Sequence, residues 1–191
     1  AKKYYDIEFD NFAIAMFHPV TTEFNNIKKD ANEFVNSLIA SDENYIVIYP
    51  NNDLGSYEII NEYERLRGRK NIRLFPSLRF EYFLIFLKNS TFIVGNSSAG
   101  IREAPFYGTP TVDIGSRQNN RSNSISIFHT RNDSKSILES VKNAKNFERD
   151  SVNKKSNFGR GDSDQIFLKL LDNGAIWNLN CQKQFQDLDY E

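Results

Sequence analysis

Ser97 and Ser98 stand in a run of small and polar residues, 96–105, directly after the apolar residues Phe92–Gly95. This order is typical of a buried strand that ends in a tight turn and opens a helix. The first backbone N–H groups of a helix have no partner inside it, and hydroxyls beside them complete a site suited to a phosphate group. The turn therefore predicts an anionic ligand, with a nucleotide as the first hypothesis. The alternative is a capped turn without any ligand, because serine at a helix start needs none.

The elements that must position this turn are short apolar runs that alternate with amphipathic segments, as in a βαβα chain. The predicted strands are 12–17, 45–49, 72–75, 92–95, 111–114 and 125–128. The predicted helices are 24–38 behind Thr21 and Thr22, 56–66, 79–89, 98–107, 133–144, 164–171 and 175–185, with a polar connection over 146–162. Because the strands are apolar on both faces, we expect an α/β fold: a Rossmann-like, doubly wound parallel sheet of about six strands with helices on both faces. The length of 191 residues and the apolar content of 39% predict one domain over 1–191.

Composition narrows the function classes. Twenty-four Lys and Arg balance 25 Asp and Glu, so the net charge of −1 gives no electrostatic basis for binding nucleic acid or an anionic membrane. Cys181 is the single cysteine, which excludes an intrachain disulfide and a cysteine metal cage. The first residues form no apolar signal segment, and no window reaches the length of a membrane span. We expect a cytoplasmic protein.

Ligands of such sheets bind outside the carboxyl ends of the strands. Polar residues follow the predicted strands there: His18, Asn51, Asn52, Asp53, Ser77, Ser97, Ser98, Arg117 and Gln118. An imidazole, hydroxyls and a guanidinium can all donate to a diphosphate, and Arg117 can do so with two N–H groups. Glu103 shares a helix face with Ala99 and Gly100 near this edge. A carboxylate there opposes phosphate, but it can accept both hydroxyls of a ribose.

Two of these side-chain groups also have simpler interpretations. Asn51 and Asp53 fit an Asx-type turn before Gly55. His18 also fits a structural histidine at the edge of the sheet, with its hydrogen bonds made inside the protein, although its place at a strand end favours a functional role. His129 belongs to no motif, so we expect it to be structural.

Four segments of the chain resemble the hydrolysing UDP-N-acetylglucosamine 2-epimerases of sialic acid and related nonulosonic acid synthesis. They are His-Pro-Val-Thr-Thr at 18–22, Tyr-Pro-Asn-Asn-Asp-Leu-Gly-Ser at 49–56, Gly-Asn-Ser-Ser-Ala-Gly-Ile-Arg-Glu-Ala-Pro at 95–105 and Ile-Gly-Ser-Arg-Gln at 114–118. They occur in the order and spacing of that family over almost the whole chain. The resemblance implies the C-terminal, UDP-binding half of a two-domain GT-B-like fold. It also implies that the N-terminal half is absent here, that the active site lies between the halves and that helices in 164–191 pack toward the absent half.

The resemblance assigns a role to seven residues. It places His18, Asn51, Ser97, Ser98 and Arg117 around the diphosphate and its sugar, with His18 catalytic, Glu103 on the ribose and backbone groups near Phe75 on the uracil. It further implies a UDP-sugar substrate and a homo-oligomer for the full-length enzyme. No Gly-x-Gly-x-x-Gly follows a strand and no side chains have metal-ligand spacing, so we expect neither a cofactor nor a metal.

The family reaction eliminates UDP to leave 2-acetamidoglucal, then adds water with inverted configuration at C2 to release N-acetylmannosamine. Charge builds on the departing diphosphate, and one well-aimed donor there lowers the barrier by roughly 2.7 to 4 kcal/mol. The acid and base that move the C2 proton are expected on the absent half. This chain alone is therefore expected to bind the UDP-sugar without converting it to product.

Two positions depart from the family pattern. Asp113 stands where Asn is usual, and residues 117–121 read Arg-Gln-Asn-Asn-Arg where the family has Arg-Gln-x-Gly-Arg. We expect Asn120 to replace the glycine by adopting a positive φ, which Asn tolerates better than most residues. The sugar stays open between N-acetylglucosamine and a diacetamido-trideoxy analogue.

Three other functions stay open. A non-hydrolysing epimerase returns UDP-N-acetylmannosamine, although the His-Pro-Val-Thr stretch and Arg117-Gln118 favour the hydrolysing branch. A glycosyltransferase with the same half-fold leaves the sugar on an acceptor. A catalytically inactive module senses UDP-sugars without turnover.

Overall fold

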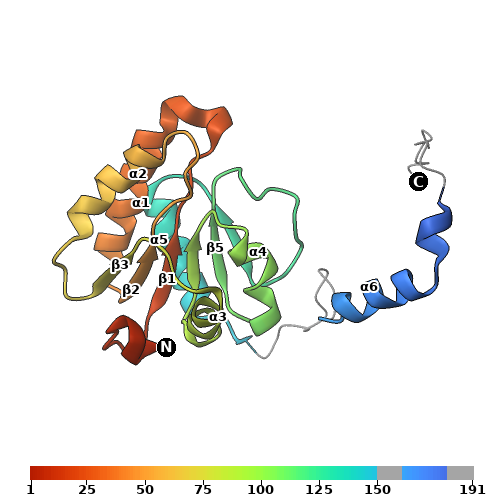
Figure 1. The fold of residues 1–191 in the computed structure, drawn as a ribbon. Coiled ribbons are helices and arrows are strands. Elements are labelled where there is room, and N and C mark those ends of the chain that lie inside the picture. The colour runs from red at the N-terminus through yellow and green to blue at the C-terminus, as the bar shows by residue number, and fades with distance from the viewer. Residues whose placement is uncertain (150–160, 180–191) are drawn as a thin grey trace. The chain divides into compact units, whose positions relative to one another are not determined.

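Six parallel strands form one sheet in the order β3-β2-β1-β4-β5-β6 (Figure 1). The strands are β1 (Ala13–Met16), β2 (Tyr45–Ile48), β3 (Ile72–Phe75), β4 (Ile93–Gly95), β5 (Thr111–Ile114) and β6 (Ile127–Thr130). The computed structural model describes residues 1–149 and 161–179. The chain winds outward from β1 and then, after returning to β4, in the opposite direction, so the sheet is doubly wound as predicted. The order reverses between β1 and β4, where such sheets hold their ligands.

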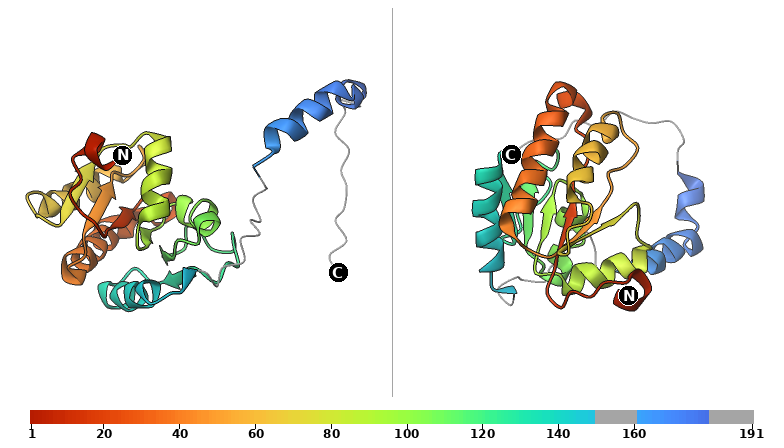
Figure 2. Two further views of the ribbon diagram at one scale, coloured as in Figure 1. Left: turned by 90° about the horizontal axis from the view of Figure 1, so that it is seen from below. Right: turned by 90° about the vertical axis from the view of Figure 1, so that its left-hand side faces the viewer.

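Helices cover both faces of the sheet (Figure 2). They are α1 (Ile27–Ser41), α2 (Ser56–Tyr63), α3 (Phe80–Asn89), α4 (Ala99–Arg102) and α5 (Ser134–Lys145), with 3-10 turns η1 (Lys2–Tyr5), η2 (Thr21–Asn26), η3 (Glu64–Leu66) and η4 (Pro105–Tyr107). Side chains of α1, α2 and α5 pack in one apolar cluster, and those of α3 and α4 pack in a second.

Alternate residues of each strand enter the two clusters. Ala13 and Ala15 of β1 face the cluster that contains Phe34 of α1, whereas Ile14 faces the cluster that contains Phe86 of α3. This alternation follows from the two-residue period of a strand. Phe34 is 0% exposed, so its burial alone contributes about 1.5–3 kcal/mol. The two clusters hold the strand ends, and therefore the loops after them, in fixed positions.

The helix predicted at 24–38 lies at 27–41, and the helix predicted at 56–66 is α-helical only as far as Tyr63. Two other predicted elements differ more from the structure. The helix predicted at 98–107 is a single α-turn followed by η4, because Gly100 is a weak helix former and Pro105 lacks the N–H that a longer helix needs. The last strand lies at 127–130 instead of 125–128. The serine hydroxyls of Ser122 and Ser124 accept the N–H groups two residues onward, which keeps this segment in local turns.

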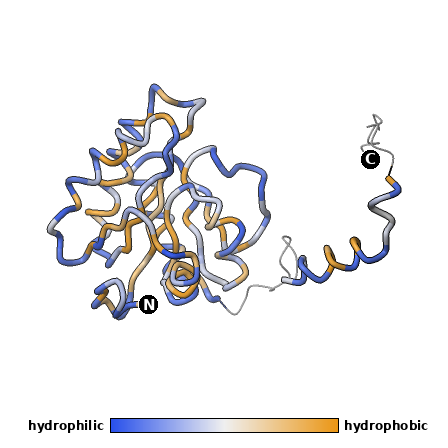
Figure 3. Tube along the Cα trace, viewed as in Figure 1, coloured by the Kyte–Doolittle hydropathy of each residue, from blue (hydrophilic) through white to orange (hydrophobic). Residues whose placement is uncertain are grey.

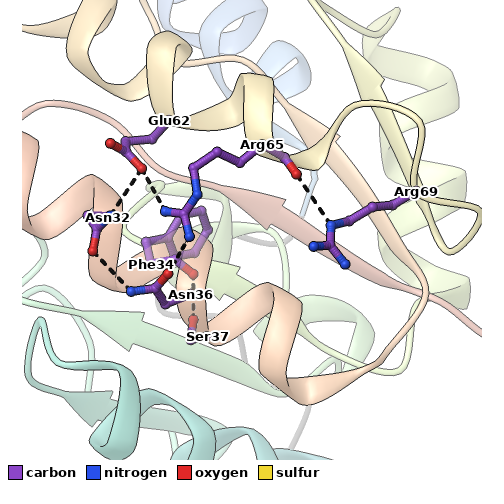
Figure 4. A network of polar contacts seen from close by, with 7 residues as sticks. All are labelled: Asn32, Phe34, Asn36, Ser37, Glu62, Arg65 and Arg69. Atoms are coloured by element: carbon purple, nitrogen blue, oxygen red, sulfur yellow. Dashed lines mark hydrogen bonds and ion pairs between the residues drawn. The ribbon is translucent and has the colours of Figure 1, made fainter.

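A polar network ties α1 to α2 (Figure 4). Asn32 and Arg65 both donate to the Glu62 carboxylate, at 3.3 and 2.8 Å. The Asn36 side chain donates to Asn32 at 3.0 Å and accepts from Arg65 at 2.6 Å. Asn32 and Asn36 belong to α1, Glu62 belongs to α2 and Arg65 belongs to η3.

Residues 1–155 and 156–191 are two separate compact units. In the second unit, α6 (Ser163–Asp172) confirms the helix predicted at 164–171, and η6 (Ala175–Asn178) occupies the start of the segment predicted at 175–185. Residues 150–160 and 180–191 lie outside the described residues. Apolar and polar residues alternate along α6 (Figure 3), and Ile166, Phe167 and Leu170 are exposed by about half.

Candidate functional site

A cavity of about 360 Å³ lies at the carboxyl ends of the strands. Each of four strands supplies a residue to its wall: His18 follows β1, Asn51 follows β2, Ser77 follows β3 and Ser98 follows β4. Glu103, after α4, completes the wall. The structure therefore brings together four of the seven predicted site residues, namely His18, Asn51, Ser98 and Glu103.

Gly95 lets the turn after β4 pass close to β1. Its φ is +137°, and a Cβ there would lie 1.8 Å from the Met16 carbonyl oxygen. The next residue, Asn96, donates its N–H to that same oxygen at 3.1 Å. Only glycine permits this approach, so the small-residue run has a structural cause that the sequence pattern did not reveal.

The His18 ring is held in its neutral form. Its Nδ1 accepts the Asn51 backbone N–H at 3.1 Å, which requires a lone pair on Nδ1 and leaves the proton on Nε2. Burial, and then the nearby positive charge of Arg117, lower the pKa of His18 from 6.5 to about 4. At neutral pH the ring therefore offers one N–H donor, from Nε2.

The backbone amides of the turn after β4 are used differently from the prediction. The N–H groups of Ala99 and Gly100 already donate to the Oγ and carbonyl of Ser97, at 3.3 and 3.1 Å. In contrast, the N–H groups of Ser97 and Ser98 make no hydrogen bond within the described part of the chain. These two amides, rather than those of the one-turn helix, are the ones open to an anion.

Arg117 lies beside this turn without lining the cavity. Its Nη1 donates to the Asn96 carbonyl at 3.1 Å, and Gln118 Nε2 donates to the same oxygen at 2.9 Å. Burial lowers the pKa of Arg117. No carboxylate of the described residues lies within ion-pair distance of its guanidinium, although Asp53 is near enough to oppose the effect of burial. A partly desolvated cation thus stands at the edge of the turn.

Glu103 carries an acceptor without a partner. Its Oε2 is buried and makes no hydrogen bond in the described residues. An unsatisfied buried carboxylate oxygen is costly, and Glu103 lines the cavity. The arrangement suits a ligand that brings hydroxyl donors.

Phe75 ends β3 but does not line the cavity. Its carbonyl accepts the Tyr49 N–H at 3.0 Å, and its ring packs edge-on against Tyr5 at 5.3 Å. The cavity wall at this strand is formed by the next three residues, Pro76–Leu78.

Asp113 and His129 form a pair that the sequence did not reveal. His129 Nδ1 lies 2.8 Å from Asp113 Oδ2, while Asp113 is 1% exposed and its Oδ1 has no partner in the described residues. The prediction missed the pair because it placed the last strand two residues early, whereas Asp113 is in register with His129. Burial raises the pKa of Asp113, and the hydrogen bond from His129 opposes the rise.

The described residues contain no group of three or more His, Cys, Asp or Glu side chains placed to hold a metal ion. Among the same residues, no helix combines the length and apolarity needed to cross a bilayer.

Curated relatives and a family model match most of the chain. The model described as UDP-N-acetylglucosamine 2-epimerase matches residues 1–172. A UDP-N-acetylglucosamine 2-epimerase of Neisseria meningitidis serogroup B is 44% identical over an alignment of 194 positions, which covers 98% of this chain and 50% of that protein. A hydrolysing UDP-N,N'-diacetylbacillosamine 2-epimerase of Legionella pneumophila is 29% identical over 161 residues, 83% of this chain and 41% of that protein. The chain spans half or less of the length of these relatives.

Solved structures share the fold. The Methanocaldococcus jannaschii UDP-GlcNAc 2-epimerase in complex with UDP-GlcNAc and UDP has a TM-score of 0.72 at 16% identity, covering 91% of this chain and 48% of that one. The Neisseria meningitidis epimerase bound to UDP-GlcNAc has a TM-score of 0.69 at 13% identity, covering 90% of this chain and 48% of that one. The predicted α/β, Rossmann-like half of a GT-B-type fold is confirmed.

Proposed function

Because the chain belongs to the UDP-N-acetylglucosamine 2-epimerase family, we propose that it is the UDP-binding half of a hydrolysing sugar-nucleotide 2-epimerase. One observation carries the proposal. Hydrogen-bond donors at the ends of three strands, and one carboxylate oxygen of Glu103 that has no partner in the described residues, lie together where the strand order reverses. Donors suit a diphosphate, and the acceptor suits a ribose. A UDP-sugar presents both groups.

The diphosphate contacts follow from the donors. His18 donates from Nε2, the turn after β4 donates the two open amides with the hydroxyls of Ser97 and Ser98, and Arg117 supplies positive charge. Because burial already disfavours the Arg117 cation, an anion beside it recovers part of that cost. The Asn51 side-chain amide, now held by Asp53 at 2.5 Å, lies at the same wall for the sugar.

The nucleoside contacts follow from the acceptor and the apolar wall. Glu103 Oε2 accepts the ribose hydroxyls, which satisfies the buried oxygen. The uracil lies against Pro76–Leu78, next to the backbone of Phe75. This places the base near β3 and the diphosphate near β4, so the nucleotide runs across the carboxyl ends of β2 and β1.

The proposed chemistry is elimination followed by hydration. Loss of the C2 proton and cleavage of the bond between C1 and the diphosphate oxygen leave 2-acetamidoglucal and UDP. Water then adds its oxygen to C1 and a proton to C2 with the opposite configuration, which gives N-acetylmannosamine. In this scheme His18, Ser98 and Arg117 stabilise the charge on the leaving diphosphate, each well-aimed donor lowering the barrier by about 2.7–4 kcal/mol. The groups that move the C2 proton belong to a preceding half.

A non-hydrolysing epimerase is the second candidate, and it differs only in whether UDP returns to the sugar. The His-Pro-Val-Thr stretch, the Arg117-Gln118 pair and the likeness to the hydrolysing Legionella relative favour hydrolysis. The apolar side chains exposed on α6 support the further proposal that this helix packs against that preceding half, whereas residues 180–191 of the segment predicted to do so lie outside the described residues.

Product analysis tests the proposal. This chain is co-purified with the N-terminal half of the Neisseria relative, supplied with UDP-N-acetylglucosamine, and the products are separated by anion exchange. Free N-acetylmannosamine with UDP supports hydrolysis. UDP-N-acetylmannosamine identifies the non-hydrolysing branch, and turnover by this chain alone contradicts the assignment of the C2 proton transfers to another half.

A further inference from the structure

Asn96 binds β1 and the residues that extend it. Its Oδ1 accepts the His18 backbone N–H at 2.7 Å, and its Nδ2 donates to the His18 carbonyl at 2.8 Å. Its own N–H donates to the Met16 carbonyl at 3.1 Å. Two of these hydrogen bonds hold the backbone of His18, and the third holds Met16 at the end of β1, so Asn96 fixes this segment relative to the turn after β4.

The backbone carbonyl of Asn96 binds the loop after β5. Its carbonyl accepts from Arg117 Nη1 at 3.1 Å and from Gln118 Nε2 at 2.9 Å. A carbonyl oxygen has two lone pairs, so both donors are accepted together. Asn96 thus stands between the two side chains that the proposed function places on the diphosphate, His18 and Arg117.

The side chain at this position must be a primary amide. The two His18 groups need one acceptor and one donor at the same time, which an aspartate or a leucine does not supply. Asn96 is 1% exposed, so water does not replace a lost partner. Truncation therefore leaves the part-buried N–H and carbonyl of His18 without these partners, and the His18 backbone must move to recover hydrogen bonds.

We propose that Asn96 is a positioning residue that sets the separation of His18 and Arg117 and so shapes the diphosphate site, without touching the ligand itself. The proposal rests on the proposed function for its ligand, UDP. The position of His18 is a property of the protein without a ligand, so the role of Asn96 can also be tested without any nucleotide.

The first readout is the titration of the His18 ring, followed by NMR. In the wild type we expect His18 to titrate near pH 4 with its proton on Nε2. In Asn96→Ala the ring is released toward solvent, and its midpoint rises by at least one pH unit.

The second readout is the affinity for UDP. We expect the dissociation constant of Asn96→Ala for UDP to rise about tenfold or more, because His18 and Arg117 no longer lie at the separation that suits the diphosphate. Asn36→Ala is the matched control. The Asn36 side chain also makes two hydrogen bonds, within the network of α1 and α2, and its loss leaves both readouts unchanged.

Two further measurements guard against a variant that fails to fold. Asn96→Leu keeps the branching at Cγ and leaves no cavity, while it removes both side-chain hydrogen bonds, and it is expected to act like Asn96→Ala. In the wild type itself, the His18 N–H is expected to exchange about 100-fold or more slowly than an open loop amide, because it is bound to a buried acceptor. Exchange of this amide at the open-loop rate overturns the proposal without any variant.

The outcomes separate the two proposals. Failure of the wild type to bind UDP contradicts the proposed function, while the histidine titration and amide exchange still decide the role of Asn96. Binding by the wild type with an unchanged His18 midpoint and unchanged UDP affinity in folded Asn96→Ala contradicts the positioning role alone.

Discussion

His18 makes the stability of this protein depend on pH in a defined window. In the folded chain its ring stays neutral down to about pH 4, whereas in the unfolded chain it takes up a proton below its ordinary value of 6.5. The unfolded state therefore binds more protons between pH 6.5 and pH 4, and the free energy of unfolding falls as the pH is lowered through that window. Above pH 6.5 the effect is absent, and below pH 4 it is complete.

The size of the effect follows from the same two values. Integrated from pH 7.5 to pH 4.5, the difference in proton binding corresponds to a loss of about 2–3 kcal/mol. This is a large part of the stability of a typical domain, about 5–15 kcal/mol. The physical sources are the burial of the ring and the positive charge of Arg117.

The assay compares the wild type with His18→Gln, which does not titrate. Urea unfolding at pH 7.5 and pH 4.5 gives the loss for each protein, and the carboxylates common to both cancel in the difference. We expect the wild type to lose about 2–3 kcal/mol more than His18→Gln. Equal losses, within about 0.5 kcal/mol, refute the assignment of a buried, neutral His18.

Two further predictions concern the backbone and the buried pair beside the site. Gly95→Ala is expected to lower the free energy of unfolding by more than about 4 kcal/mol, because the new Cβ meets the Met16 carbonyl oxygen. Gly68 is the control: it has φ +74° and open space around it, so Gly68→Ala is expected to lower the free energy of unfolding by about 1–2 kcal/mol. Similar losses for the two variants in urea unfolding contradict the close approach of β4 to β1. Asp113→Asn is expected to raise the unfolding temperature at pH 7, because burial raises the pKa of Asp113 and its ionised form costs stability above that value. The gain shrinks as the pH falls toward 3.8 and is smallest below 3.8, where the wild type becomes protonated in both states; a gain independent of pH between 7 and 3.5 counts against this explanation.

The sheet was predictable because its strands are apolar on both faces and its helices separate them. The same pattern predicted the residues at the strand ends, since parallel strands bring their carboxyl ends to one edge. The positive φ expected for Asn120 is confirmed at +61°. That prediction succeeded because it depends on one residue's own backbone preference.

The parts that were missed depend on partners distant in sequence. Asn96 lies 78 residues from His18, and nothing in its own neighbourhood indicates that its side chain binds that backbone. The Asp113–His129 pair needs the register of β6, which local serine turns shifted by two residues. The length of α4 was overestimated because small residues that suit a turn also suit a helix start, and Pro105 then ended it.

Calorimetric titration with UDP tests the central claim most directly. The whole chain is titrated beside a variant in which Ser97, Ser98 and Arg117 are alanine, with the Asn36→Ala variant as a folded control. The account predicts saturable binding by the wild type and the control and its loss in the triple variant. Undiminished binding by the folded triple variant, or no binding by the folded wild type, contradicts it.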